Sequence, residues 1–518
     1  MGGSSAINAQ ALIPFSSSDL DDWEKLIGNE GWNSSLLSYL DKIFSLRLPD
    51  NEKETHSNVS WAEDFAASAK GPVNASFAGV QQDPVTKAWD ETFGNLGYSL
   101  TASPFSGHSI GAFNTPSTVH PTTKTRCYSG NSYYLPVAHR SNLIVYTHSI
   151  ASRVLLSGEE HKATGVEFIQ ADVTKTINAK KEIILCAGVF NSPKLLELSG
   201  IGDEDVLRAA GVDIKVSHPH VGTNLQDHIL CGVSFEVVEG ISTLDGLIRN
   251  EPEAVQQVMA LYQEHQAGPI ISSGVSSFGY LPTVDFVNDT QARDTVLEGL
   301  TNMEARHPLD EARTEKLRQL LLIGKEGIGQ YFLFQGQSGA GGRDTTAGLV
   351  PDPQPENFIT LAVALSHPLS TGTVHITSSD VAAPPTVDHR YLTNAIDVEL
   401  HARHVRYLET IAGAEPFSSI IKPDGKRNDN RAFFEGSLDK ATEFAKLAST
   451  TFWHSVGTCA MAPREKGGVV DSNLRVHGVA GLRVVDASVF PLIPQSNTQS
   501  LVYAVAERAS ELILESWK

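Results

Sequence analysis

The sequence of 518 residues predicts an α/β fold in which strand–loop–helix units are interrupted by a middle region of antiparallel strands and helices. Two observations support this prediction. Strand, turn and helix patterns alternate in the outer parts of the chain, whereas residues 232–345 are predicted to form an inserted helical region, followed by further strands. The chain is also too long for one ordinary hydrophobic core, so more than one domain is expected.

The first 135 residues are expected to begin with helices and to continue as turn-rich chain. Residues 19–46 start with aspartates that can cap a helix, and their apolar residues recur at helical spacing. We therefore expect two short helices, broken at Gly28–Gly31. Residues 73–135 are rich in turn-forming and aromatic residues, and "WDETFGNLGY" (89–98) is predicted to be a helix.

Residues 142–187 are rich in β-branched residues with turn residues between the runs, which predicts strands. Cys186 lies inside one of these apolar runs and is expected to be a small core residue. A helix is expected next, beginning near Asn191 or Ser192, with Pro193 in its first turn and Gly200 at its end. The predicted strand runs are "NLIVYTHS" (142–149), "SRVLLSG" (152–158), "KATGVEFIQ" (162–170) and "TINAKKEIILCAG" (176–188).

The remaining elements follow from the same periodicities. Strands are expected within 357–380 and at 482–488, because these stretches contain runs of β-branched and apolar residues. Three stretches have the 3.6-residue apolar repeat of an amphipathic helix, namely 309–323, 394–412 and 497–514.

Composition and charge exclude several classes of protein. A formal net charge of −20 argues against nucleic acid and anionic membranes as partners. No apolar run approaches the roughly 18 residues that a membrane helix needs. The four cysteines are far apart and form no CxxC pair, which argues against a disulfide framework and against a metal site of the zinc type.

Four separated segments together resemble the glucose–methanol–choline (GMC) flavoprotein oxidoreductases, specifically their fungal branch. They occur in family order, and the resemblance runs from end to end of the chain. The segments are "GGSSAIN" (2–8), "AGVFNSPKLLELSGIG" (187–202), "VGTNLQDH" (221–228) and a tail that includes "FWHSVGTCAM" (452–461) and "LRVVDASVFPLIPQSNTQS" (482–500).

The resemblance implies an FAD-binding domain with a doubly wound parallel sheet and an α+β substrate domain built on an antiparallel sheet. It assigns 1–72 to part of the FAD-binding domain with lid helices, and 138–231 and 451–518 to the same domain, the last with the catalytic segment. It assigns 73–137 and 232–450 to the substrate domain.

The cofactor contacts implied by the resemblance combine small residues with hydrogen-bonding side chains. Glycine permits close approach of the backbone, and serine, asparagine and glutamine offer polar groups to phosphate or to the flavin edge. The N-terminus of the last helix adds its dipole. The implied FAD contacts are Gly3, Ser4 and Asn8, Ala151 at the adenine end, Asn224, and Asp486, Ala487 and Gln499 at the ribityl–pyrophosphate part.

The resemblance also implies two catalytic residues. His454 in "FWHSVGT" corresponds to the histidine that faces the flavin ring, where a neutral imidazole would take the hydroxyl proton of an alcohol while hydride leaves for the flavin. Asn497 in "PQSNTQS" occupies the partner position, where its amide would hold the substrate oxygen. Asn497 also precedes the closing helix and is a candidate for its N-cap.

The implied function is FAD-dependent oxidation of the CH–OH group of a small or medium organic alcohol, with oxygen or a quinone-like carrier as electron acceptor. By analogy with the fungal branch, the substrate is expected to be an intermediate of secondary metabolism. Two alternatives stay open. A redox-neutral lyase or cyclising dehydratase would use His454 as an acid–base, and a degenerate chain would have no activity.

One family element is not found within the 518 residues, namely a strand, a GxGxxG turn and a helix, which would precede "GGSS". A fragment, a strand supplied by a second chain and a pseudoenzyme are the explanations left open. An incomplete doubly wound sheet is then expected, in which the strands at 183–187 and 482–486 expose unpaired edges. We expect such a chain to bind FAD poorly or to fold badly.

Overall fold

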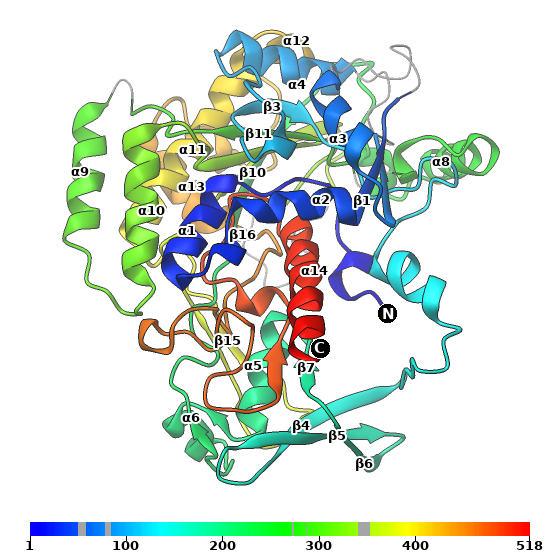
Figure 1. The fold of residues 1–518 in the computed structure, drawn as a ribbon. Helices are drawn as coiled ribbons and strands as arrows, with labels where there is room; N and C mark the ends of the chain where they lie inside the picture. The colour runs from blue at the N-terminus through cyan, green and yellow to red at the C-terminus, as the bar shows by residue number, and fades with distance from the viewer. Residues whose placement is uncertain (50–58, 78–83, 272–273, 287–288, 340–352) are drawn as a thin grey trace.

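The computed structural model describes residues 1–49, 59–77, 84–271, 274–286, 289–339 and 353–518 (Figure 1). Its central feature is a six-stranded sheet with the order β16–β10–β13–β12–β11–β3, in which all neighbours are antiparallel. The strands are β3 (Gly111–Asn114), β10 (Ile229–Glu236), β11 (Ser277–Leu281), β12 (Gly329–Phe334), β13 (Phe358–Leu365) and β16 (Thr450–Thr451).

Both faces of this sheet are covered, which is why β13 is apolar at nearly every position. One face, which includes Tyr331 and Leu361, packs in one cluster with residues of α4 (Pro84–Asn95), α11 (Ala395–Gly413) and α13 (Leu438–Ala448). On the opposite face Phe278, Tyr280 and Phe332 pack with Ala11 and Ile13 near the N-terminus. Helices α9 (Thr290–Thr301) and α10 (Asp310–Ile323) lie to one side of the sheet (Figure 1).

A second core joins the two ends of the chain. Residues of α1 (Ser17–Ile27) and α2 (Ser38–Ile43) pack with the closing helix α14 (Gln499–Ser516) around the fully buried Trp23 and Trp32. The same core contains two parallel strand pairs, one of β1 (Phe44–Arg47) with β2 (Val73–Ser76), the other of β7 (Ile183–Leu185) with β17 (Leu482–Val484). Helix α3 (Glu63–Ser68) adds Phe65 to it.

A three-stranded antiparallel sheet lies at the lower end of the molecule in Figure 1. It contains β4 (Ser149–Ser157), β5 (Lys162–Gln170) and β6 (Val173–Asn178). The remaining elements are short strands and helices between these units: α5 (Gly188–Leu198), β8 (Ile201–Gly202), α6 (Glu204–Ala209), β9 (Val216–Ser217), α7 (Asp245–Ile248), α8 (Pro252–His265), β14 (Thr373–His375), β15 (Thr386–Asp388) and α12 (Phe417–Ile420).

The three long predicted helices are confirmed as α10, α11 and α14, and the break predicted at Gly28–Gly31 lies between α1, which ends at Ile27, and α2. The expected start of α5 is wrong. This helix begins at Gly188, and Pro193 lies within it and not in its first turn. The reason is tertiary, because Oδ2 of Asp486, distant in sequence, accepts the Gly188 N–H at 3.0 Å and so satisfies the helix N-terminus.

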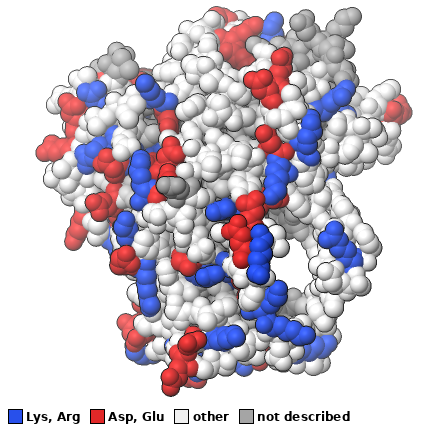
Figure 2. Space-filling view, viewed as in Figure 1, with Lys and Arg blue, Asp and Glu red and all other residues white. Residues whose placement is uncertain are grey.

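Two predictions about strands are wrong. Residues 142–148 belong to no strand, and β4 begins only at Ser149. Residues 176–188 are divided between the end of β6 and β7, and Cys186 after β7 is exposed and does not lie in the core. Around 142–148 the chain stands away from the body of the molecule, with an opening behind it (Figures 1 and 2). The middle region 232–345 contains the predicted helices but also contributes β10, β11 and β12 to the central sheet.

The face drawn in Figure 2 carries acidic and basic side chains interspersed with one another. Among the described residues, no helix has both the length and the apolar character needed to cross a membrane.

Candidate active site

A buried carboxylate holds the loop that carries His454. Oδ1 of Asp227 accepts the backbone N–H of His454 at 2.9 Å, and Oδ2 accepts the hydroxyls of Thr451 at 2.5 Å, Tyr391 at 2.6 Å and Ser455 at 3.2 Å. Burial raises the pKa of Asp227, and these four donors oppose that rise. The loop is thus fixed from β10, because Asp227 lies two residues before that strand.

The imidazole of His454 is buried between aromatic rings. Its Nδ1 lies 2.8 Å from Nδ1 of His228, and Nε2 of His228 lies 2.9 Å from the carbonyl oxygen of Pro494. The Phe452 ring lies against His454 at 4.4 Å between centroids, and Phe332 of β12 stacks on Phe452 at 5.0 Å. Burial, and then the neighbouring His228, lower the pKa of His454 well below its usual range, so the ring is neutral and can accept a proton at neutral pH.

Asn497 is held by the same strand that supports the histidine. Its Oδ1 accepts a hydrogen bond from Nε2 of Gln330 at 2.6 Å, and Gln330 lies two residues before Phe332 on β12. Side chains two residues apart on a strand point to the same face of the sheet. Asn497, which is bonded to Gln330, and Phe452, which stacks on Phe332, therefore contact the same face. The N-cap role of Asn497 is wrong, because the N-cap of α14 is Thr498 and no side chain bonds there.

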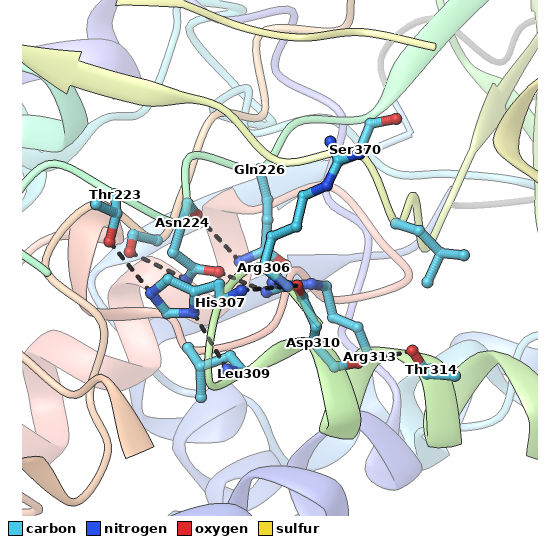
Figure 3. Close-up of polar contacts among 12 residues, drawn as sticks. Thr223, Asn224, Gln226, Arg306, His307, Leu309, Asp310, Arg313, Thr314 and Ser370 are labelled. Carbon is cyan, nitrogen blue, oxygen red and sulfur yellow. Dashed lines mark hydrogen bonds and ion pairs between the residues drawn. The ribbon is translucent and has the colours of Figure 1, made fainter. Parts of the chain in front are cut away.

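Asn224 lies in a buried polar cluster that joins α10 to the loops at Gly457 and Pro491 (Figure 3). Its Oδ1 accepts from Nη1 of Arg313 at 2.5 Å, and its Nδ2 donates to the carbonyl oxygens of Gly457 and Pro491, each at 3.2 Å. Arg313 also pairs with Asp310 one turn earlier on α10. The amide of Asn224 therefore braces the loops on either side of the site, and its polar atoms are engaged within the protein.

The N-terminal candidates for cofactor contact lie near the surface. Gly3 has a φ of +52°, and the position that a Cβ would occupy there has no atom within 4 Å. Ser4 is exposed, whereas Asn8 uses its Oδ1 to accept from Arg126 at 2.8 Å. Ala151 lies on β4 with its side chain exposed, in the sheet at the lower end of the molecule.

The C-terminal candidates surround the N-terminal ends of two helices. The Asp486 carboxylate caps α5 through Gly188 and Ser192, and its other oxygen accepts the N–H of Ser488. Ala487 is half-buried next to it. Both amide atoms of Gln499, in the first turn of α14, are buried without a hydrogen-bond partner.

These observations test whether the residues fit FAD. An amide buried without a partner at the start of an 18-residue helix suits a polar anionic ligand, because the helix dipole favours negative charge there and the Nε2 group of Gln499 can donate to it. The open backbone at Gly3 allows close approach of such a ligand. The donor set therefore fits, with Asn224 and Asp486 acting through the loops and helix that they brace.

Several residues of the site were not selected from the sequence. Asp227 and His228 stand in the quoted segment "VGTNLQDH", of which only Asn224 was singled out. Their signal was present, since an aspartate and a histidine adjoin within a family motif. Gln330 and Arg313 carry no local signal, because only the fold brings them to Asn497 and Asn224.

Sequence and structure comparisons find known proteins that are similar to this chain. Two protein-family models, both described as GMC oxidoreductase, match residues 1–230 and 368–506 of the sequence. The dehydrogenase mpl7 of Monascus purpureus is 31% identical over 538 aligned residues, which cover 99% of this chain and 83% of that protein. An FAD-dependent oxidoreductase from Chaetomium thermophilum superposes with a TM-score of 0.84 at 25% identity, over 99% of this chain and 86% of the other. A fungal aryl-alcohol oxidase superposes with a TM-score of 0.82 at 25% identity, over 100% of this chain and 86% of the other.

Proposed function

The chain belongs to the GMC oxidoreductase family, and from this premise we propose that it is an FAD-dependent enzyme that oxidises the CH–OH group of a small or medium organic alcohol. The observation that carries the proposal is the neutral, buried imidazole of His454, whose backbone is anchored by Asp227. A substrate made in secondary metabolism is part of the proposal.

His454 accepts the hydroxyl proton of the substrate in this mechanism. Its Nδ1 is engaged with His228, so the proton goes to Nε2. FAD, when bound, supplies the acceptor for the hydride that leaves the carbinol carbon. Removing the hydroxyl proton favours departure of that hydride, because negative charge on the oxygen moves toward the carbon.

Asn497 orients the alcohol in this mechanism. Gln330 holds its Oδ1, which leaves the Nδ2 group to donate to the substrate oxygen. Aromatic rings beside His454 exclude water from the proton transfer. The residues proposed to hold FAD are Gly3, Ser4, Asn8, Ala151, Ala487 and Gln499, with Asn224 and Asp486 holding the surrounding backbone.

The test is anaerobic mixing of the FAD-loaded chain with aryl, allylic and aliphatic alcohols, followed by the flavin absorbance. FAD is added in excess, and its binding to the chain is measured first by gel filtration. We expect bleaching with at least one alcohol class, and a loss of about 10²- to 10⁴-fold in its rate in His454→Ala, with flavin binding retained. Re-oxidation by oxygen and by a quinone then identifies the electron acceptor.

Two results would contradict this proposal. Product formed without bleaching would support the redox-neutral lyase or cyclising dehydratase. Failure of the folded chain to bind added FAD would support the degenerate chain without activity.

A further inference from the structure

We propose that His228 is a positioning residue that places the proton of His454 on Nδ1 and so leaves Nε2 as the proton acceptor. The inference rests on the proposed function, since it explains how His454 is prepared for its role. The geometry that supports it is a linear chain of three groups, His454, His228 and the Pro494 carbonyl, joined by two short contacts.

The donor and acceptor of each hydrogen bond follow from the contact with the Pro494 carbonyl. A carbonyl oxygen can only accept a hydrogen bond, so Nε2 of His228, at 2.9 Å from the Pro494 oxygen, must carry a proton. The opposite arrangement would leave two lone pairs facing each other in a buried place, which costs the free energy of an unsatisfied polar group.

The protonation state of His228 determines which atom donates in its contact with His454. This imidazole is fully buried, and burial lowers its pKa to about 3, so it is neutral at physiological pH and carries one proton. Since that proton is on Nε2, the Nδ1 atom has a bare lone pair. Nδ1 of His454, 2.8 Å away, must then be the donor.

The tautomer of His454 follows. A neutral imidazole with its proton on Nδ1 has its lone pair on Nε2, the atom that can receive a proton from the substrate. When Nε2 accepts that proton, the ring becomes a cation and its Nδ1–H bond to His228 becomes charge-assisted, which strengthens it. His228 therefore favours both the correct neutral form and the protonated product.

The charged and titratable groups around the pair do not disturb this assignment. The carboxylate of Asp227 bonds the backbone of His454, not its ring. His367 is the titratable neighbour of His228, and burial lowers its pKa to about 3, so it is neutral as well. The two rings of the pair are nearly perpendicular, at 85°, with centroids 5.0 Å apart.

The experiment compares two substitutions of His228. His228→Leu removes the acceptor, whereas His228→Asn can present its side-chain oxygen near the position of Nδ1. His401→Gln is the matched control, since His401 is also a buried histidine but lies on α11, outside the site.

The first readout is the tautomer of His454, from ¹⁵N NMR of the chain labelled in its imidazole nitrogens and assigned with His454→Gln. The proton is expected on Nδ1 in the wild-type chain, in His228→Asn and in His401→Gln, and on Nε2 or divided between the two nitrogens in His228→Leu. A wild-type proton on Nε2 would overturn the inference whatever the activity.

The second readout is the pH profile of alcohol oxidation. We expect His228→Leu to lower kcat by about 100-fold with little change in KM, and its acid limb to move to higher or lower pH than in the wild-type chain, because the base loses its partner. His228→Asn should restore most of kcat, and His401→Gln should leave both quantities unchanged. If His228→Leu keeps the wild-type kcat and profile, the inference is wrong.

The outcomes separate the two proposals. A wild-type Nδ1 proton together with full alcohol oxidation by His454→Ala would contradict the proposed function and leave the tautomer assignment standing. If His228→Leu fails to fold, the wild-type NMR spectrum and His228→Asn still decide the inference.

Discussion

Strand β13 and residues 142–148 are similar in sequence and opposite in structure. "FITLAVAL" in β13 is buried along its whole length, whereas "NLIVYTH" is exposed throughout and forms no strand. β13 is hydrogen-bonded to β10 on one edge and to β12 on the other. Residues 142–148 pair with no strand in the part of the chain that the structure describes, although the ring of Tyr146 contacts Phe168 of β5. The comparison shows that β-branched sequence becomes a strand where neighbours cover it.

The same difference divides the candidate site. The residues proposed to perform the chemistry are attached to the fully paired sheet, through Gln330 on β12 and through His228 and Asp227 next to β10. Gly3, Ser4 and Ala151 are exposed, as residues 142–148 are. The proposed catalytic residues are thus held by the paired strands, whereas three of the proposed FAD contacts lie in exposed segments and the others, such as Asn224, Asp486 and Gln499, do not.

The largest expected difference between the regions concerns matched arginine substitutions. Arg313→Met leaves Asp310 unpaired in a buried cluster beside the sheet, and we expect the free energy of unfolding to fall by about 3–5 kcal/mol. Arg153→Met on β4 breaks an exposed pair with Glu167 and should cost at most about 1 kcal/mol. Urea unfolding of both variants measures this. Equal losses in the free energy of unfolding of the two variants would contradict the difference between the two regions.

A second test uses the two similar sequences themselves. Leu361→Ala in β13 removes a fully buried side chain and should lower the free energy of unfolding by about 2–5 kcal/mol. Ile144→Ala removes a side chain that is 71% exposed and should change it by about 0.5 kcal/mol or less. A large loss at Ile144 would mean that this segment is covered in solution.

The smallest expected effect is a dependence on pH. Burial lowers the pKa of His404 on α11 to about 3, so the folded protein keeps this ring neutral while the unfolded chain protonates it below about pH 6.5. The unfolded state then binds more protons, and stability falls as the pH drops from 6.5 toward 3. At pH 5.5 this one histidine should contribute a loss on the order of 1 kcal/mol.

Thermal or urea unfolding of His404→Gln between pH 5 and 8 measures that contribution. The variant should show a weaker fall in stability below pH 6.5 than the wild-type chain. His148→Gln, in the exposed segment, is the matched control and should keep the wild-type slope. An unchanged slope in His404→Gln would show that the ring is not held neutral by the fold.

The sequence predicted those elements whose cause is local. Helices α10, α11 and α14 follow from the spacing of their apolar residues, and their observed ranges agree with that spacing. The start of α5 could not be predicted in this way, because Asp486, 298 residues away, caps it. The same holds for Asn497, whose amide is taken by Gln330 on β12.

What the sequence determined by itself is the set of amphipathic helices, the order of the family segments and the presence of His454 and Asn497 in them. Only the tertiary structure decided that 142–148 is not a strand, that Arg313 braces Asn224, and that His228 lies against His454. The physical reason is that helical periodicity is encoded within a few turns, whereas strand pairing, buried ion pairs and the proton of a histidine depend on partners hundreds of residues away.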